Sequence, residues 1–315
     1  METITAVRLM DAFPDFTATG FDVNYYNSRF VKANYLIHAW SKEISFPEHW
    51  GALSIKMAFG GKEFYEDGYC VYAVDDANYL VFNEGKLYSS YIQSDEAVES
   101  LTISFSPEFE SEATRIWQAR HKDLLDEPFF FRANKFYFAE QLYAHNQCVT
   151  PIAIKIKSLS RNIWRNQLQI SELYCQLYEA MLDTQQDIVI RIQNLQAEKK
   201  STRTELYRRL NNARDFIYSC YAKPLTLDEI AQVACLSPIY FLREFKKMFG
   251  VPPYKYLQQR RIQEAKRLLE TSSLSISNIC ALVGYDDLSS FGKLFKKYYL
   301  QSPEQFRLTK KSIFT

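Results

Sequence analysis

The sequence predicts an α+β protein in two parts: a β-barrel followed by helices in residues 1–200, and an all-α domain in residues 201–315. Three observations lead to this prediction. Short strand-like segments fill residues 33–106, helical periodicity begins at residue 107, and one pattern of paired helices occurs twice near the end of the chain. A length of 315 residues is enough for two domains of ordinary size.

Residues 33–106 alternate between strand-like segments and turns. The segments are rich in β-branched and aromatic residues, and the turns between them include Gly60-Gly61, Asp67-Gly68 and Asn83-Glu84-Gly85. The expected strands are 35–40, 52–57, 69–73, 79–82, 86–92 and 100–105. Many short strands at this spacing favour a closed barrel or a double-sheet roll.

Helical patterns replace the strands in residues 107–200. The expected helices are 107–125, 151–164 and 171–195. The last of them bears an apolar stripe formed by Leu173, Leu177, Met181, Ile188 and Ile192. The aromatic stretch 129–138 is expected to pack back on the barrel. The polar segment 196–204 is the expected linker, and the helix 205–221 enters the second domain.

The second domain contains the same supersecondary unit twice. The two copies are about residues 225–249 and 275–299. Ile230 matches Ile279 at an offset of 49 residues, whereas Phe241 matches Phe291 at an offset of 50, so the second copy has one extra residue in its turn. Each copy is a short helix, a tight turn and a second helix, which is the helix-turn-helix pattern that reads the major groove of DNA.

Local signals within each copy support this assignment. Ser237 stands where a helix N-cap is needed, before Pro238, and Asp286 or Asp287 takes that place in the second copy after the flexible Gly284. Small and apolar residues are expected to form the buried faces. They are Leu227, Ile230, Ala231, Ala234 and Ala281, with Phe241, Phe245, Phe291 and Phe295.

A single helix is expected between the two copies, over residues 253–269. Seventeen residues give a helix of about 25 Å. A rigid element of that length could hold two recognition helices about one DNA turn apart, near 34 Å. The charge agrees with nucleic-acid binding, because residues 201–315 carry 19 Lys and Arg against 10 Asp and Glu, whereas residues 1–200 have a net charge of −8.

The C-terminal third resembles the DNA-binding domain of AraC/XylS-family transcriptional regulators. The motifs that carry the resemblance are Arg261-x3-Ala265-x2-Leu268-Leu269, Gly284-Tyr285, Ser289, Phe291, Phe295-Lys296-Lys297, Ser302-Pro303 and Phe306-Arg307. One position departs from the family pattern, since Leu300 stands where the family usually has glycine. Leucine is penalised in the left-handed conformation that often ends a helix, so we expect this helix to end differently.

The resemblance implies which side chains meet DNA. The expected base contacts are Ile239, Leu242, Arg243, Leu288, Ser289 and Lys293. The expected backbone contacts are Ser237, Tyr240, Lys246, Lys247, Lys296 and Lys297. Arg243 is the candidate for a guanine contact, and the apolar members can meet thymine methyl groups. The family also implies a promoter or operator as partner, an activator that contacts RNA polymerase, and a homodimer joined by helices such as 171–195. The alternative is that their apolar stripe packs only on its own barrel.

AraC-like regulators often carry a cupin-like sensor barrel before the DNA-binding domain, and residues 33–106 resemble one in order and pattern. The turn at residues 83–85 lies where such barrels have an Asn-Pro-Gly turn. A small-molecule effector is therefore possible, and the side chains that could line a barrel interior are Leu36, His38, Trp40, Met57 and Tyr69, although ordinary core packing is the alternative. A second hypothesis is a dimerisation or protein-interaction module without a ligand. A remote third is an enzyme with an accessory DNA-binding tail.

We expect no catalytic, cofactor or metal site. The four His residues form no H-x-H pair, and no P-loop, Rossmann or nucleophile-elbow motif occurs. The six Cys residues form no C-x-x-C pair, which indicates reduced thiols in a cytoplasmic protein. No run of 18 apolar residues and no signal-peptide pattern occurs, so we expect neither export nor a membrane span.

Overall fold

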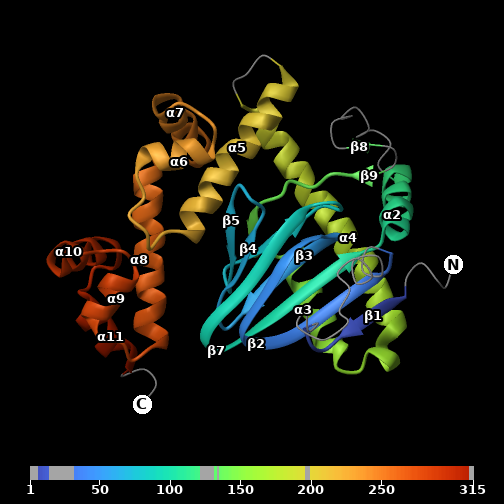
Figure 1. The fold of residues 1–315 in the computed structure, drawn as a ribbon, viewed down its shortest axis with the longest axis horizontal. Helices are drawn as coiled ribbons and strands as arrows, with labels where there is room; N and C mark the ends of the chain where they lie inside the picture. The colour runs from blue at the N-terminus through green and yellow to red at the C-terminus, as the bar shows by residue number, and fades with distance from the viewer. Residues whose placement is uncertain (1–5, 14–31, 121–130, 133–134, 196–198, 312–315) are drawn as a thin grey trace. The chain divides into compact units, whose positions relative to one another are not determined.

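The computed structural model describes residues 6–13, 32–120, 131–132, 135–195 and 199–311. It forms two compact units, Met1–Arg208 and Arg209–Thr315, and each is described by itself. The first unit contains a β-sheet with helices, and the second is helical (Figure 1). The expected α+β class is confirmed in this form.

One eight-stranded sheet organises the N-terminal unit. Its strands are β1 (Val7–Met10), β2 (Asn34–Trp50), β3 (Leu53–Phe59), β4 (Glu63–Glu66), β5 (Val71–Val74), β6 (Asn78–Phe82), β7 (Leu87–Phe105) and β10 (Leu142–Ala144). The order is β1-β2-β7-β3-β6-β10, and β4 pairs with both β5 and β7. The pair β1–β2 is parallel and the other pairs are antiparallel. A separate two-stranded sheet joins β8 (Phe131–Arg132) to β9 (Lys135–Phe136).

The sheet corrects the expectation of a closed barrel of short strands. Within the described residues, no pairing joins the two ends of the path, β1 and β10. The expected strands 86–92 and 100–105 are parts of one 19-residue strand, β7, which runs beside the 17-residue β2 (Figure 1). Their pairing shifts register between Ser41 and Glu43 and between Phe46 and His49. Such irregularities bend a long ribbon without ending it, so the polar residues between the two expected segments form no turn.

The described residues of the N-terminal unit also form the helices α2 (Pro107–Arg120), α3 (Val149–Ser160) and α4 (Ile163–Gln193). The ring of Phe105, at the end of β7, lies 5.5 Å from that of Tyr174 and 5.6 Å from that of Tyr178, both on α4. Such edge-on pairs each add about 0.5–1.5 kcal/mol beyond the buried area. All five residues of the apolar stripe on α4 are buried within the chain, which favours self-packing over a dimer contact for that stripe.

The C-terminal unit is formed by helices. They are α5 (Lys200–Ser219), which begins in the first unit, α6 (Leu227–Val233), α7 (Pro238–Phe249), α8 (Pro253–Thr271), α9 (Ile276–Leu282), α10 (Leu288–Tyr299) and α11 (Pro303–Lys311). The pairs α6–α7 and α9–α10 are the two expected helix-turn-helix units, and α8 is the helix between them. The segment from residue 200 to 204 belongs to α5, although the sequence suggested a linker there. The helix α11 was not expected.

The core of this unit contains the expected aromatic residues. Phe241, Phe245, Phe291 and Phe295 are all fully buried. Two expected core positions are wrong, because Leu227 is 38% exposed and Ala281 is exposed. The small residue that is buried in the second unit is its neighbour Cys280, which matches Ala231 at the offset of 49.

The helix ends follow the expected capping chemistry in part. Ser237 holds the N-cap position of α7, but its side chain makes no capping hydrogen bond. Asp287 caps α10, and its carboxylate accepts hydrogen bonds from the backbone N–H groups of Ser289 and Ser290 at 3.2 and 2.7 Å. Leu300 ends α10 in the left-handed conformation, with φ 62°, as Gly250 ends α7 with φ 75°. The expectation that α10 ends differently was therefore wrong.

Candidate nucleic-acid interface

The two recognition helices, α7 and α10, turn their phenylalanines inward and the expected base-contact residues outward. Ile239 is 85% exposed, Leu242 is 36% exposed and Leu288 is 47% exposed. The other three members, Arg243, Ser289 and Lys293, are also exposed. Ile239 gains little from the core at such exposure, and part of the Leu242 and Leu288 side chains also stays exposed, so a partner surface is a physical reason for these apolar residues.

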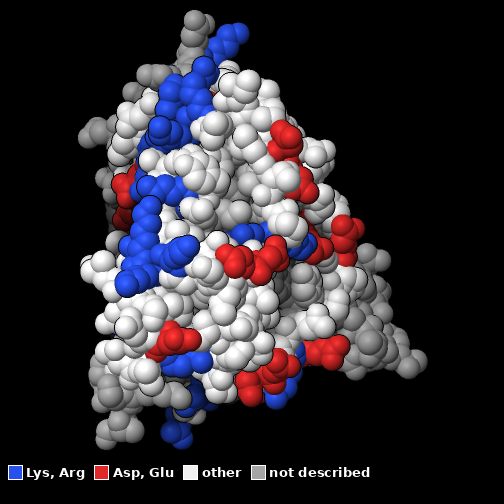
Figure 2. Space-filling model, turned by 90° about the vertical axis from the view of Figure 1, so that its left-hand side faces the viewer, with Lys and Arg blue, Asp and Glu red and all other residues white. Residues whose placement is uncertain are grey.

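The expected backbone contacts lie on the same two helices. Lys246, Lys247, Lys296 and Lys297 occupy the last turns of α7 and α10 and are exposed, as is Ser237, whereas Tyr240 is half-buried. Lysines there are favoured by the helix dipole. Figure 2 shows Lys and Arg side chains in a stripe on the side of the molecule where Figure 1 places α7 and α10. A stripe of this kind attracts phosphate groups.

An ion-pair cluster restrains the basic side chains of α7. The Nε atom of Arg243 donates to Oε1 of Glu244 at 2.8 Å, and Nζ of Lys247 lies 3.3 Å from the same oxygen. The Arg243 guanidinium also lies over the ring of Tyr240, 5.0 Å from its centroid. Sequence reasoning missed Glu244, although its spacing of three residues from Phe241 places it on the buried side of the helix.

The second recognition helix carries no such cluster. Lys293 takes the position of Arg243, and the half-buried Leu294 takes that of Glu244. Its distinctive acidic group is the cap Asp287. Hydrogen bonds from the Ser290 side chain, and then from the backbone N–H groups of Ser290 and Ser289, lower the pKa of Asp287. That carboxylate is therefore engaged at the helix start, as a cap rather than as a phosphate neighbour.

Arginines on α8 connect the parts of the C-terminal unit. Arg261 donates from Nε to the carbonyl of Tyr221 and from Nη2 to the carbonyl of Lys223, both at 2.8 Å. Its guanidinium lies 5.3 Å from the ring centroid of Tyr285, in the turn of the second helix-turn-helix unit. Arg260 is buried and lies 3.9 Å from the ring centroid of Tyr218. These contacts indicate that the arginine of the linker-helix signature is a structural residue.

The N-terminal unit does not gather the expected interior residues around a common space. Trp40 is 51% exposed and Tyr69 is 87% exposed, so neither lines an interior. His38 bonds with Oγ of Ser160 on α3 at 3.0 Å and with Oε1 of Glu99 at 2.7 Å, which places its ring between the sheet and a helix. Leu36 and Met57 are buried core residues.

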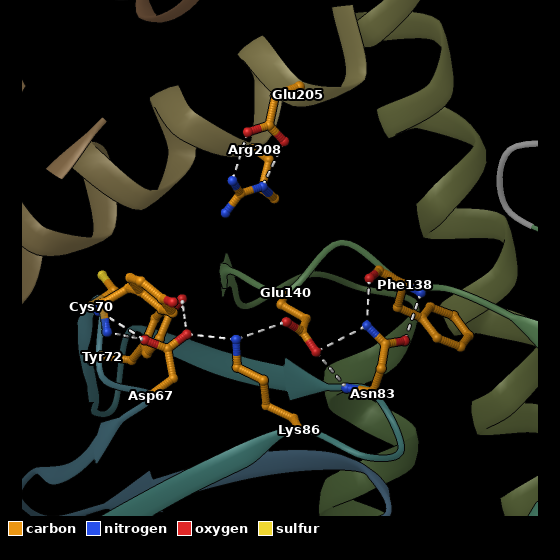
Figure 3. Close-up of polar contacts among 10 residues, drawn as sticks. Asp67, Cys70, Tyr72, Asn83, Lys86, Phe138, Glu140, Glu205 and Arg208 are labelled. Atoms are coloured by element: carbon orange, nitrogen blue, oxygen red, sulfur yellow. Dashed lines mark hydrogen bonds and ion pairs between the residues drawn. The ribbon is translucent and has the colours of Figure 1, made fainter. Parts of the chain in front are cut away.

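The turn at residues 83–85 is instead held by a polar network (Figure 3). Asn83 donates from Nδ2 to the carbonyl of Phe138 at 2.8 Å and accepts from the backbone N–H of Phe138 at 2.9 Å. Lys86 bridges Asp67 at 2.6 Å and Glu140 at 3.1 Å. Burial opposes the charge of Lys86, but Glu140 and Asp67 outweigh it and raise its pKa. The network joins two turns of the sheet to the segment before β10.

We also searched the described part of the chain for metal sites and for membrane-spanning helices. Those residues contain no group of three or more His, Cys, Asp and Glu side chains placed to hold a metal ion. Among the described helices, none is both long and apolar enough to cross a membrane.

Comparison with known proteins identifies the C-terminal part. Residues 230–309 match a family model described as a helix-turn-helix domain. The HTH-type transcriptional regulator AlkR of Acinetobacter baylyi is 35% identical over 102 residues, which are 32% of this chain and 33% of AlkR. The Msm operon regulatory protein of Streptococcus mutans is 34% identical over 110 residues, or 35% of this chain and 39% of that protein.

Among solved structures, the C-terminal domain of the response regulator yesN from Fusobacterium nucleatum is 38% identical. The alignment covers 30% of this chain and 93% of that one, with a TM-score of 0.29. The aligned region thus spans little more than a third of the length of the two curated relatives. Residues 230–309 are thus similar to the helix-turn-helix domains of HTH-type transcriptional regulators, in keeping with the AraC/XylS resemblance of the sequence.

Proposed function

We propose that the chain is a sequence-specific transcriptional regulator that binds promoter or operator DNA through α7 and α10. The observation that carries the proposal is the duplicated recognition helix, with a buried aromatic face and an exposed basic face in each copy. In each copy two lysines at the helix end can neutralise phosphates, and exposed side chains near the helix start can reach base edges.

Salt dependence tests the role of the lysines. Lys246, Lys247, Lys296 and Lys297 are four phosphate contacts under this proposal, and each contact contributes about −0.9 to the slope of log K against log salt. Full-length protein should be titrated onto duplex DNA from its own upstream region, and onto random duplex, by fluorescence anisotropy. Replacing all four lysines with alanine should reduce the slope by about 3 to 4 on both duplexes. An unchanged slope would exclude these lysines from the interface.

The same titration separates sequence-specific binding from general affinity. Replacing Arg243 with alanine should relax specificity at one base pair, by about 1–3 kcal/mol of discrimination. Equal loss of affinity on every sequence would show that Arg243 contacts only the backbone. Failure to prefer upstream DNA over random DNA would place the operator elsewhere, and a library selection would then be required.

We propose that the N-terminal unit controls this binding and that the protein is an activator, acts as a homodimer and contacts RNA polymerase. The support for control by a small ligand is a buried lysine on β3. Nζ of Lys56 donates to the hydroxyl of Tyr88 at 2.8 Å and lies 5.0 and 5.6 Å from the ring centroids of Tyr88 and Tyr65. The described residues offer this ammonium no carboxylate within 4.0 Å, although it is only 6% exposed. A buried charge in that state favours an anionic ligand.

A buried carboxyl group lies in the same part of the sheet. Glu63 is 2% exposed, and its Oε2 atom has no hydrogen-bond partner among the described residues. Burial raises the pKa of Glu63, and hydrogen bonds from Ser100 and Tyr65 oppose that rise only in part. Burial thus disfavours the charged form of Glu63, and a carboxylate effector would give the Lys56 ammonium an anionic partner.

Thermal unfolding of the full chain tests this part of the proposal, with sodium acetate, benzoate and octanoate as probes. At least one carboxylate should raise the unfolding midpoint of the wild type and not that of Lys56→Met. Lys42→Met, at a lysine whose side chain is 60% exposed, is the matched control and should keep the response. If no carboxylate shifts the midpoint and sedimentation shows a stable dimer, the N-terminal unit is a dimerisation module.

A further inference from the structure

Glu244 is a buried acidic residue on an otherwise basic recognition helix. Its side chain is only 4% exposed, whereas that of its neighbour Arg243 is 60% exposed. A carboxylate beneath a surface meant for phosphates lowers the local positive charge, so general DNA affinity gives no reason for it. Packing at this position does not require an acid either, because the second recognition helix has Leu294 there. The contacts of the carboxylate supply a different reason.

The carboxylate binds Arg243 through one particular nitrogen. Oε1 of Glu244 accepts from Nε of Arg243 at 2.8 Å, and the two terminal nitrogens of the guanidinium are not part of this contact. Reading of guanine uses two guanidinium N–H groups in a fork directed at O6 and N7. The ring of Tyr240, 5.0 Å from the guanidinium carbon, restrains the same group from one face. The guanidinium is thus held at Nε by Glu244 and on one face by Tyr240, and its contact with Glu244 does not use the two terminal nitrogens that a guanine fork requires.

Building on the proposed DNA-reading function, we infer that Glu244 is a positioning residue, which orients the Arg243 guanidinium for guanine recognition and makes the first helix-turn-helix unit the more selective reader. A side chain oriented before binding loses less freedom on binding. In the second unit, Lys293 takes the place of Arg243 as a flexible point charge and Leu294 takes that of Glu244, so the acidic group that interacts with Lys293 is the exposed cap Asp287 and not a buried carboxylate. Selected sites should therefore contain one strongly required G·C pair opposite α7, and weaker requirements opposite α10.

Glu244 could also act through Lys247 instead of Arg243, and the experiment must distinguish these two roles. The Nζ atom of Lys247 lies 3.3 Å from the same oxygen, so Glu244 could act by restraining a phosphate contact instead. A lysine that contacts phosphate changes affinity on all sequences alike, whereas an arginine that contacts a base changes discrimination at one position. Discrimination is therefore the readout, and it is one that a purely structural role would not move.

The experiment begins with selection of binding sites from a random duplex library by the full-length protein. The base pair read by Arg243 is the one whose preference Arg243→Ala relaxes. Affinities are then measured on the selected duplex and on a duplex with that pair changed. Glu244→Gln should weaken binding to the selected duplex about fivefold and to the changed duplex less than about twofold, as expected for partial loss of a bidentate contact. In the Arg243→Ala background, Glu244→Gln should have no further effect on discrimination.

Two variants keep the outcome interpretable. Lys247→Met removes the other ion pair and should weaken binding to both duplexes by the same factor. Glu244→Asp keeps the charge but shortens the side chain, so it should fold like the wild type and still lose discrimination; it replaces Glu244→Gln if that variant unfolds. The inference would be overturned if the Glu244 variant lost affinity equally on both duplexes. It would also be overturned if the Glu244 variant lowered discrimination further in the Arg243→Ala background. If the wild type selects no sequence at all, the proposed function fails first.

Discussion

The two helix-turn-helix units place their glycines at opposite ends. In the first unit the turn contains Cys235 in the left-handed region, with φ 51°, and the recognition helix ends at Gly250, with φ 75°. In the second unit the turn contains Gly284, with φ 83°, and the recognition helix ends at Leu300, with φ 62°. Each unit thus has one glycine and one residue that carries a Cβ at the two positions where the backbone is left-handed.

The neighbouring atoms show at which of these positions a Cβ atom would clash. A Cβ at Gly284 would lie 2.6 Å from the carbonyl oxygen of Ala222 and 3.0 Å from Nη2 of Arg261, whereas a Cβ at Gly250 would meet nothing within 4 Å. The left-handed conformation alone costs a residue with a Cβ about 1–2 kcal/mol. The first unit tolerates Cys235 and the second tolerates Leu300 at that cost, but Gly284 has a second, steric requirement.

The largest effect is expected from Gly284→Ala. The methyl group combines the left-handed penalty with a clash against backbone, so the free energy of unfolding should fall by about 3 kcal/mol or more. Urea unfolding followed by far-UV circular dichroism measures it. Gly250→Ala is the matched control and should cost only about 1–2 kcal/mol. Equal losses for both variants would show that the close approach of Ala222 does not exist in solution.

A smaller effect of opposite sign is expected from Leu300→Gly. The Leu300 side chain is 85% exposed, so its removal sacrifices little buried area, while the left-handed strain disappears. We expect the free energy of unfolding to rise by about 1 kcal/mol. Leu300→Ala is the matched control, because alanine also shortens the side chain but keeps the left-handed backbone strain. A gain from alanine equal to that from glycine would attribute the effect to the exposed leucine side chain.

The smallest effect concerns the caps of the recognition helices. The pKa of Asp287 is lowered in the folded chain, so its contribution to stability is present above the ordinary aspartate pKa and is lost as pH falls through the lowered value. Ser237 makes no comparable bond in the first unit. Asp287→Asn keeps an N-cap that does not titrate. The stability difference between wild type and Asp287→Asn should therefore change as the pH falls from about 5 through the lowered pKa of Asp287, and a constant difference would refute the role of this carboxylate.

The sequence predicted the C-terminal unit far better than the N-terminal sheet, for a physical reason. A helix-turn-helix unit is defined by contacts a few residues apart, so capping residues and the phenylalanine spacing are visible along the chain. Strand pairing joins residues that are far apart in the sequence. A polar stretch such as residues 93–97 has the same sequence pattern whether it forms a turn or an exposed part of a bent strand such as β7. Local patterns therefore could not distinguish short strands in a barrel from two long bent strands.

The candidate interface was predictable in part. The exposed and basic positions follow from helical spacing, and the structure places them on the outer face as expected, although their contact with DNA stays a prediction. Glu244 was not predictable as a functional residue, because its effect depends on the rotamer of Arg243. Leu300 misled because the left-handed penalty is small beside the packing of Phe295, Tyr299 and Phe306 around the helix end. A local preference of about 1–2 kcal/mol yields to such a cluster.

The helix α8 also constrains how the spacing between two DNA contacts could ever change. Each residue inserted into an α-helix adds about 1.5 Å and rotates the rest of the helix by about 100°. One added base pair moves a contact by about 3.4 Å and rotates it by roughly 35°. A small insertion in the α-helix therefore cannot reproduce the shift and rotation that a small insertion in the DNA requires. A residue inserted between Pro253 and Arg261 would also displace Arg261 from the carbonyls of Tyr221 and Lys223. If α7 and α10 contact DNA as proposed, the spacing between the two contacted grooves is therefore set by α8, and binding sites must have that spacing.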